Sequence, residues 1–371
     1  MMNIRDLETP AILVLEEAMM YNLKGYQRAC DQAGKQLWPM VKTHKSTAIA
    51  NLQQELGAKG FLCGTLDECE ALADSGLFPL MYAYPLADGV NCRRAVELAK
   101  KGDFYARVDD LDGAAVLNAA AEQAGVVIPV TIIVDCGLHR FGRLPEEVVD
   151  FAKGLEELKH LHLVGLSTHP GHVYGESDPA KVPDYARQES GAMAKAVGLL
   201  REAGYELTHI TAGSTPTFPG EVADPNIGVC HPGNYIFMDC IQMANGTAKE
   251  EACALRVYAT VISHPREDLF LCDAGAKCLG LDLGAHGNTS VVGHGRVVGH
   301  PELVVAGLSE EVGKLKVSGP TDLKVGDRIQ IIPNHSCSAA NLTDWYVMVN
   351  AEGEVTGHIP VDIRSNRSKK C

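Results

Sequence analysis

Short apolar runs alternate with helix-like segments between residues 37 and 230, and this alternation constrains the fold more than any other feature of the chain. The first run, Leu37–Lys42, is followed by a helix-like segment at Ser46–Leu56. The later runs are Gly60–Cys63, Leu80–Tyr84, Phe104–Val108, Pro129–Val134, Leu161–Leu166, Leu207–Thr211 and Asn226–Val229. The clearest later helix-like segments are Asn91–Lys100, Asp112–Ala124, Glu146–Leu155 and Asp184–Ala203, and Thr65–Glu68 has the spacing of a helix-opening capping box.

Strands that alternate with helices in this way predict a parallel sheet. Eight such units in roughly 240 residues favour a closed (β/α)8 barrel of the TIM type. An open doubly wound sheet is the alternative, because the seventh and eighth helices are the least distinct in the pattern.

The sequence pattern changes after Met243, where short β-like runs are separated by turns that contain Gly and Pro. These runs are Leu255–Ile262, Leu269–Cys272, Glu302–Leu308, Arg328–Ile332 and Trp345–Val349. We therefore predict an α/β chain with a barrel over residues 10–245 and a β domain over residues 246–371, which residues 1–9 join. The β-rich run Thr9–Leu15 is a further candidate for the β domain.

Composition and charge exclude several classes of function. The formal net charge of -14 argues against a nucleic-acid partner, because binding to phosphate needs a basic face. No apolar run reaches membrane-spanning length, and the N-terminus has no signal-like apolar region. The twelve scattered cysteines include no Cys-x-x-Cys pair, which is typical of reduced thiols in a cytoplasm.

The stretch Trp38–Lys45 brings lysines to the end of an apolar run. A lysine at such a strand mouth is partly desolvated, so its amine becomes nucleophilic and suits Schiff-base chemistry with a carbonyl cofactor. Lys42 and Lys45 are both candidates, and a solvated lysine at the end of a strand is the alternative for either one.

Polar and glycine-rich stretches follow the later runs, at the ends where a barrel collects its active site. They are Asp135–Gly142, His169–Tyr174, Ala212–Thr215 and His231–Tyr235. The residues that could present backbone N–H groups or hydroxyls to a phosphate are Gly213, Ser214, Thr215, Gly233, Asn234 and Tyr235. Neither glycine-rich stretch has a P-loop lysine, which argues against a nucleoside triphosphate.

Two further candidates carry different chemistry. Arg140, in a loop between glycines, is a pure donor, and beside a pyridine nitrogen it would keep that nitrogen unprotonated. His335 and Cys337 stand two residues apart on a segment expected to be extended, so their side chains would point the same way. Both are zinc ligands, and a site with so few protein ligands leaves positions open for water or substrate. A surface arginine and a structural His-x-Cys are the alternatives.

These motifs together resemble a known family. Val41–Lys45, Asp135–Gly142, His169–Tyr174, Gly213–Thr215, Pro232–Asp239, Asp273–Lys277 and Pro333–Cys337 occur in this order. The chain is similar over nearly its whole length to the D-serine dehydratase / D-threonine aldolase family of enzymes that use pyridoxal 5'-phosphate. That family has the alanine-racemase type of fold (fold type III), a cofactor-binding barrel plus a β domain.

The resemblance implies roles for individual residues. Lys42 would carry the cofactor, Arg140 would face the pyridine nitrogen, and Tyr174 would lie near the cofactor. Lys42, Tyr174 and His169 are the predicted catalytic residues. Gly213, Ser214, Thr215, Gly233, Asn234 and Tyr235 would hold the phosphate. His335 and Cys337 would bind a divalent metal, with zinc preferred over manganese, and the enzyme would be a cytoplasmic homodimer.

Within this family, His-x-Cys at the metal and the His-x-Gly-x-x-Tyr loop resemble the dehydratases, whereas aldolases have Asp at the second metal position. The predicted reaction is therefore elimination from a D-β-hydroxy amino acid such as D-serine, giving a keto acid and ammonia. Retro-aldol cleavage of a substrate such as D-threonine to glycine and an aldehyde is the first alternative. An amino-acid racemase and a non-catalytic cofactor carrier are the others. Two stretches depart from the family pattern: Trp38–Met40 stands in place of Arg-Pro-His, and Ala212–Thr215 in place of a Gly-Gly-x-Thr loop.

Overall fold

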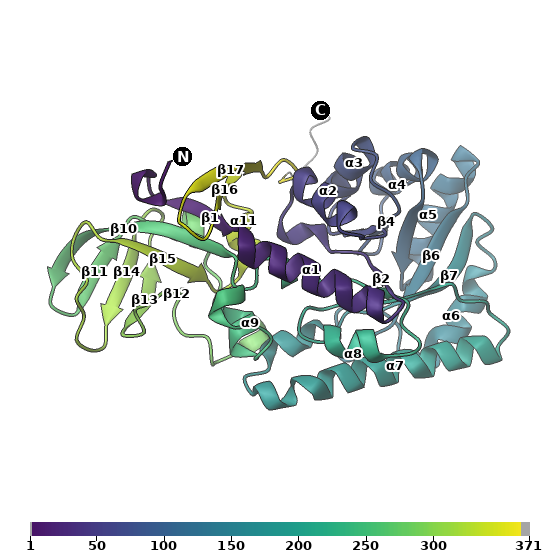
Figure 1. Cartoon of the computed structure of the whole chain (residues 1–371). Helices are drawn as coiled ribbons and strands as arrows, with labels where there is room; N and C mark the ends of the chain where they lie inside the picture. The colour runs from purple at the N-terminus through teal and green to yellow at the C-terminus, as the bar shows by residue number, and fades with distance from the viewer. Residues whose placement is uncertain (1, 365–371) are drawn as a thin grey trace.

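The first of two sheets is a parallel eight-stranded barrel, seen in a computed structural model that describes residues 2–364 (Figure 1). Its strands follow the order β2-β9-β8-β7-β6-β5-β4-β3. Their bounds are β2 Gln36–Leu37, β3 Phe61–Cys63, β4 Leu80–Tyr82, β5 Phe104–Val108, β6 Ile128–Ile133, β7 Leu161–Ser167, β8 His209–Ala212 and β9 Val229–Cys230. A parallel bridge between Met40 and Leu62 joins the two ends of this order. The predicted barrel is confirmed.

Each barrel strand is followed by a helix, and the 17-residue helix α1 precedes the first strand. Their bounds are α1 Glu16–Gln32, α2 Thr47–Glu55, α3 Leu66–Asp74, α4 Gly89–Lys101, α5 Leu111–Ala124, α6 Val148–Leu155, α7 Val182–Glu202, α8 Phe218–Ala223 and α9 Cys240–Ala244. The last two are short, which is why their pattern in the sequence is weak. Short 3-10 helices lie at η1 Ile4–Asp6, η2 Val41–Thr43, η3 Pro145–Glu147, η4 Gly171–Gly175, η5 Pro179–Lys181, η6 Asn234–Ile236, η7 Glu250–Ala252 and η8 Ala285–Gly287.

The first predicted strand is wrong in its extent. The strand β2 ends at Leu37, and Lys42 lies instead on the 3-10 helix η2. Pro39 has no backbone N–H to donate to a ladder, so regular pairing stops before it, and only Met40 returns to bridge position. The predicted capping box is half formed. Thr65 accepts from the Glu68 N–H, but the Glu68 carboxylate accepts from Gly64 and Lys45.

The second sheet has nine strands and is largely antiparallel. Its main path is β13-β14-β11-β10-β1-β16-β17, with β15 paired to β10 and β12. Their bounds are β1 Ala11–Leu15, β10 Leu255–Arg266, β11 Leu269–Cys272, β12 Gly295–Val297, β13 Leu303–Leu308, β14 Gly313–Val317, β15 Arg328–Pro333, β16 Trp345–Val349 and β17 Val355–Pro360. Two short helices, α10 Ala276–Leu279 and α11 Ser336–Ala340, interrupt it.

The expected domain boundary at residue 10 is corrected by β1. This strand pairs with β10 and β16 of the second sheet, so residues 11–15 belong to the β domain. Its three central residues are buried, and β10 and β16 cover both of its edges. The helix α1 then leads from this sheet across to the barrel (Figure 1). The boundary expected between residues 245 and 246 stays a prediction.

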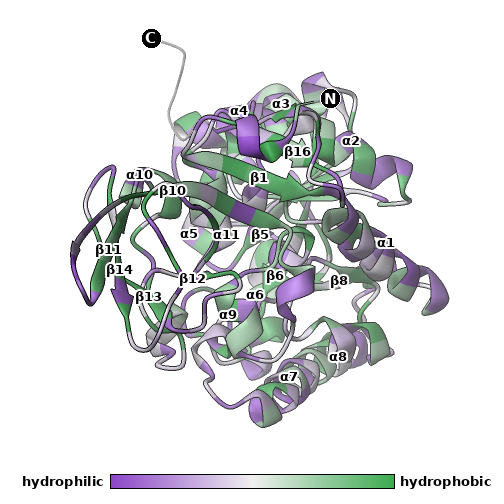
Figure 2. Cartoon of the chain, turned by 60° about the vertical axis from the view of Figure 1, so that its left-hand side comes forward, coloured by the Kyte–Doolittle hydropathy of each residue, from purple (hydrophilic) through white to green (hydrophobic). Residues whose placement is uncertain are grey.

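Aromatic rings from neighbouring segments of the barrel pack against one another. The Trp38 ring meets the Tyr105 ring edge-on at 5.7 Å, and the Tyr105 ring lies 4.6 Å from the ring of His209. Strands such as β1 and β10 are coloured hydrophobic along much of their length, while α1 and α7 carry hydrophilic stretches (Figure 2). None of the described helices is long and apolar enough to cross a bilayer.

Candidate active site

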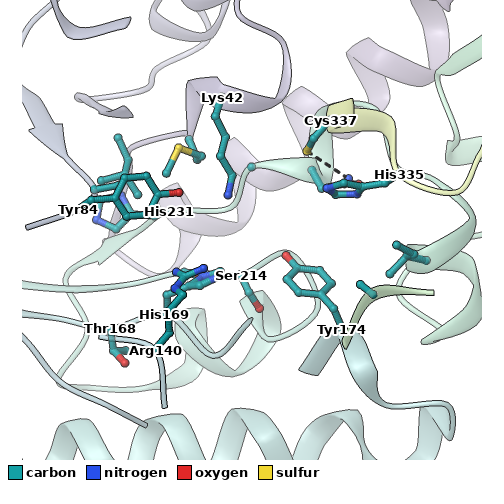
Figure 3. A pocket seen from close by; sticks show the side chains of 18 of the residues that line it. Lys42, Tyr84, Arg140, Thr168, His169, Tyr174, Ser214, His231, His335 and Cys337 are labelled. Carbon is teal, nitrogen blue, oxygen red and sulfur yellow. Dashed lines mark hydrogen bonds between the residues drawn. The ribbon is translucent and has the colours of Figure 1, made fainter. Parts of the chain in front are cut away.

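A cavity opens where the carboxyl ends of the barrel strands meet the β domain (Figure 3). It is lined by Met40, Lys42, Leu62, Ala83, Tyr84, Arg107, Arg140, Thr168, His169, Tyr174, Gly213, Ser214, His231, Gly233, Asn234, Ile241, Ala285, His335 and Cys337. Most of the residues predicted from the four glycine-rich or polar stretches therefore share one cavity with Lys42. Thr215 and Tyr235 are the exceptions.

The two candidate lysines have different surroundings. Lys45 Nζ lies 2.5 Å from the Glu68 carboxylate, and both side chains are buried. Lys42 projects into the cavity, and within residues 2–364 it takes part in no hydrogen bond or ion pair (Figure 3). Gly64 leaves room for it, because a Cβ there would lie 3.2 Å from the Lys42 Cβ. Lys42 is thus the free amine, and Lys45 is a structural cation.

Replacing Lys45 by methionine is expected to destabilise the fold but to leave the reactivity of Lys42 unchanged. The change leaves the buried Glu68 carboxylate without its cation, which typically costs about 3–5 kcal/mol. Urea unfolding should show this loss, and the Lys42 amine should stay available to an amine-reactive carbonyl probe. An unchanged unfolding midpoint would contradict the structural role of the pair.

The residues predicted to bind a phosphate lie on two loops, after β8 and β9. Gly213 packs so closely on the second loop that a Cβ would lie 2.5 Å from the Cβ of His231. The backbone N–H groups of Gly233 and Asn234 have no hydrogen-bond partner among the described residues. The two loops thus combine close backbone approach with free donors, which suits an anionic group.

Thr215 and Tyr235 lie behind the surface of these two loops instead of on it. The Tyr235 N–H donates to Thr215 Oγ1 at 3.1 Å, which ties the two loops together. The Tyr235 hydroxyl accepts from the Gln53 amide at 3.0 Å, and both Tyr235 and Thr215 are fully buried. The structure therefore gives these two predicted phosphate ligands a supporting position.

A buried carboxyl that the sequence analysis did not identify also holds the first loop. Glu221 Oε1 accepts from the Ser214 N–H at 2.9 Å and from the Thr217 hydroxyl at 2.6 Å. Burial raises the pKa of Glu221 to about 7. The Ser214 N–H is therefore engaged, and the Ser214 hydroxyl lies 2.8 Å from the Thr217 hydroxyl and accepts from the Thr217 N–H at 3.3 Å.

His169 and Tyr174 line the cavity on the segment that follows β7. The His169 Nδ1 must donate to the Gly213 carbonyl oxygen at 2.5 Å, because a carbonyl only accepts. Burial, with Lys42 and the two arginines nearby, lowers the pKa of His169 to about 3, so the ring is neutral at physiological pH. The Tyr174 hydroxyl accepts from the Thr215 backbone N–H, and burial raises the pKa of Tyr174.

Arg140 stands at the rim of the cavity. It is exposed, and its guanidinium lies 5.1 Å from the Phe141 ring centre and 5.9 Å from that of Tyr84. Arg140 lies seven residues beyond the end of β6, in the loop that follows this strand. The predicted contact of Arg140 with a pyridine nitrogen is untested and stays a prediction.

His335 and Cys337 meet at the side of the cavity, although not on an extended segment. His335 is the N-cap of the short helix α11, and Cys337 lies in its first turn. Both side chains nevertheless line the cavity next to each other (Figure 3), and Asn234 Nδ2 donates to Cys337 Sγ at 3.8 Å. Burial would raise the pKa of the Cys337 thiol, but His335, Lys42 and Thr43 outweigh it and lower the pKa. A thiol that ionises easily beside an imidazole is suited to bind a metal ion.

Asp239 positions this pair and was not predicted to do so. Its fully buried Oδ2 accepts from His335 Nδ1 at 3.2 Å and from the Ser336 N–H at 2.9 Å. Asn234 Nδ2 donates to the same oxygen at 2.6 Å. Because Nδ1 is held by the carboxylate, His335 can offer Nε2 to a metal, as ligating histidines with a carboxylate behind them do.

Replacing Asp239 by asparagine is expected to weaken metal binding about 10- to 100-fold, as loss of such an outer partner usually does. If the NH₂ group of the new asparagine replaced Oδ2, it would face the Ser336 N–H and Asn234 Nδ2, which are also donors, and their hydrogen bonds would be lost. Competition with a chromogenic chelator measures the metal affinity. Asp224→Asn is the matched control, since Asp224 is also buried but caps a turn away from the cavity. An unchanged affinity in Asp239→Asn would remove Asp239 from this role.

Within residues 2–364 no group of three or more His, Cys, Asp or Glu side chains is placed to hold a metal ion. A metal at His335 and Cys337 would therefore take its remaining ligands from water or from a bound molecule, which is the arrangement of a catalytic rather than a structural site.

The fold and the site together define a class: a barrel enzyme with a free lysine, an anion cradle and an open His–Cys pair in one cavity. Comparison with known families agrees. Residues 14–240 match the family model "Alanine racemase, N-terminal domain", and residues 254–349 match "Putative serine dehydratase domain". The chain belongs to the alanine racemase N-terminal domain family, with the second domain in the serine dehydratase arrangement.

Three relatives extend this result. D-threo-3-hydroxyaspartate dehydratase of Delftia sp. (strain HT23) is 28% identical, over 94% of this chain and 96% of its own. D-serine dehydratase of Dictyostelium discoideum is 27% identical, over 95% and 96%. The crystal structure of D-threonine aldolase from Filomicrobium marinum is 25% identical, with a TM-score of 0.89, over 98% and 97%. The predicted family and its alanine-racemase type of fold are confirmed, and the relatives named as dehydratases and aldolases are lyases of the pyridoxal-phosphate-dependent type.

One further structure bears on the metal. A D-threo-3-hydroxyaspartate dehydratase with a cysteine-to-alanine substitution, described as the metal-free form, has 27% identity and a TM-score of 0.89, over 97% of this chain and 99% of its own.

Proposed function

We propose that this chain is a pyridoxal-phosphate- and metal-dependent lyase that eliminates water from a D-β-hydroxy amino acid, as a D-serine dehydratase does. The observation that carries the proposal is the common cavity of the unpaired Lys42 amine and the open His335–Cys337 pair. The relatives named as dehydratases and aldolases support the substrate class.

The residues present fit the cofactor. Lys42 offers an unpaired amine for its carbonyl carbon, and Gly213, Ser214, Gly233 and Asn234 offer a cradle for its phosphate. When bound, pyridoxal phosphate withdraws electrons from the α-carbon of an amino acid and so makes the α-proton removable.

The chain's own groups would then handle the protons. Among the described residues that line the cavity, Lys42 is the one with an amine, so Lys42 Nζ is the base that takes the α-proton. His169, which is neutral, can accept or donate a hydrogen bond without adding positive charge beside the amine. The aromatic and aliphatic walls contributed by Met40, Leu62 and Tyr84 limit the access of bulk water.

His335 Nε2 and Cys337 Sγ would hold the metal, for which zinc is preferred and manganese is the alternative. Its chemistry is that of a Lewis acid that makes a β-hydroxyl a better leaving group. Asp239 orients His335, and Thr43 Oγ1 lies 3.2 Å from Cys337 Sγ, so both ligands are oriented by other groups of the chain.

Cys337 favours elimination over retro-aldol cleavage. Its thiolate is a softer ligand than the aspartate that the sequence resemblance assigns to aldolases at this position. With a cysteine there, the metal pair itself has no carboxylate that could accept the proton of a β-hydroxyl. Retro-aldol cleavage to glycine and an aldehyde is the second candidate, since D-threonine aldolase shares the fold. We further propose a homodimer in the cytoplasm.

The test is a product assay. Purified protein loaded with the cofactor is incubated with D-serine, D-threonine and D-threo-3-hydroxyaspartate, each with and without EDTA, and both keto acid and aldehyde are measured. We expect keto acid that disappears with EDTA and returns with zinc. Aldehyde plus glycine would move the assignment to aldolase. Racemised substrate that is insensitive to EDTA, or no product at all, would overturn the lyase proposal.

A further inference from the structure

A second arginine lies deeper in the cavity than Arg140. Arg107 is the fourth residue of β5, and only 4% of its surface is exposed. Tyr105, two residues earlier, packs its ring against Trp38 inside the barrel, so Arg107 points inward as well. It lines the same cavity as Lys42 and forms part of its floor.

Arg107 has few partners in the protein. Its Nε donates to Met81 Sδ at 3.2 Å, and its Nη2 to Thr211 Oγ1 at 3.4 Å. In the part of the chain that the structure describes, it forms no ion pair with any carboxylate. A guanidinium has five N–H donors, and a buried cation without an acceptor is costly. A cation kept at the floor of a cavity under these conditions is prepared for an acceptor that a ligand brings.

The position of Lys42 indicates which part of the cofactor reaches this floor. In pyridoxal phosphate the ring nitrogen stands opposite the carbon that bears the carbonyl group. If Lys42 at the cavity mouth engages the carbonyl, the nitrogen points away from Lys42 and into the barrel. Arg107 comes from a barrel strand, whereas Arg140 comes from a loop above the barrel and is exposed.

We propose that Arg107, and not Arg140, is the residue that donates a hydrogen bond to the pyridine nitrogen and keeps it unprotonated. This assignment rests on the proposed use of pyridoxal phosphate. It makes Arg107 a catalytic residue, because its guanidinium would touch the cofactor. A ring with an unprotonated nitrogen is a weaker electron sink. The assignment also agrees with the metal that the proposed function places at the β-hydroxyl, and it leaves Arg140 exposed at the rim of the cavity.

His231 is the competing neighbour at the floor. Its Nδ1 donates to the Trp38 carbonyl oxygen at 3.0 Å, so the neutral ring can only accept at Nε2, which is buried without a partner. A pyridine nitrogen held by His231 would have to carry a proton. The protonation state of the nitrogen therefore distinguishes the two residues.

The experiment is nitrogen NMR of the holoprotein reconstituted with pyridoxal phosphate labelled with ¹⁵N in the ring. Wild type, Arg107→Gln, Arg107→Glu and Arg140→Gln are compared at neutral pH. We expect an unprotonated nitrogen in wild type and in Arg140→Gln, and a protonated nitrogen in Arg107→Glu. Loss of one charged hydrogen bond in Arg107→Gln should raise the dissociation constant of the cofactor about 10- to 100-fold.

A protonated ring nitrogen in wild type would overturn the inference and favour His231, even if the Arg107 variants failed to fold. A nitrogen whose state follows Arg140 and ignores Arg107 would overturn it as well. Neither result touches the proposed function. A wild-type protein that takes up no pyridoxal phosphate would instead refute the proposed function itself.

Discussion

Replacing Lys42 by alanine is expected to abolish turnover, by about 10³-fold or more, while the protein keeps its fold. In the proposed function Lys42 supplies both the covalent attachment of the cofactor and the base for the α-proton, and acid–base catalysis alone contributes about 10²- to 10⁴-fold. The loss of stability should be small, because Lys42 makes no hydrogen bond or ion pair within residues 2–364.

The measurements for Lys42→Ala are turnover, urea unfolding and cofactor attachment. Borohydride reduction of the wild type should fix the cofactor to the peptide that contains Lys42, and mass spectrometry of the variant should find no such peptide. The matched control is Lys45→Met, which should be less stable but still modified at Lys42. Cofactor fixed at Lys45, or a variant with more than a tenth of wild-type turnover, would refute the role of Lys42.

The barrel could be predicted from the sequence because its pattern is local. The strands of a parallel sheet are buried on both faces, so they are apolar runs, and the helices between them have capping residues and amphipathic spacing. The bounds predicted for Phe104–Val108 and Trp345–Val349 are those observed. The first strand was mispredicted because Pro39 stops a ladder that apolar composition alone would continue.

Pairing between distant strands was harder to predict. The short strand β1 could have joined either domain, and only its hydrogen bonds to β10 and β16 decide the matter. A local pattern shows that Thr9–Leu15 is β-rich, but not which sheet edge it completes.

The residues of the site also divide into those that a local motif indicates and those that only the structure brings to the site. Lys42, His335 and Cys337 stand in short motifs whose spacing carries the chemistry, so the sequence indicates them. Asp239 ends the quoted stretch Pro232–Asp239 but was given no role, because its partner His335 is distant in the chain. Glu221 and Arg107 stand in no quoted motif, although the partners of Glu221, Ser214 and Thr217, are close in sequence. Asp239 is 96 residues from His335, and Arg107 lies on an ordinary strand. In the sequence, Arg107 is only a charged residue inside an apolar run, a pattern that a strand ending at the surface would also give.

Replacing Cys337 by alanine is expected to yield a folded protein that binds the metal weakly and eliminates water about 10²- to 10⁴-fold more slowly. Loss of one of two protein ligands removes most of the metal affinity, and a Lewis acid contributes several kcal/mol to the stabilisation of a leaving group. The metal content of the purified protein and the rate of keto-acid formation are the two measurements.

The fold should survive this change because other contacts anchor α11. The Ser336 N–H donates to Asp239, and Ala339 and Ala340 are buried in the core. Cys278→Ala is the matched control, since Cys278 is also partly exposed but hydrogen-bonds to Gly275 outside the cavity. EDTA should slow the wild type to the rate of Cys337→Ala without moving its thermal midpoint. If EDTA unfolded the protein, the metal would be structural. If Cys337→Ala kept full activity without metal, the ring alone would suffice as electron sink, and elimination would no longer require the His335–Cys337 pair.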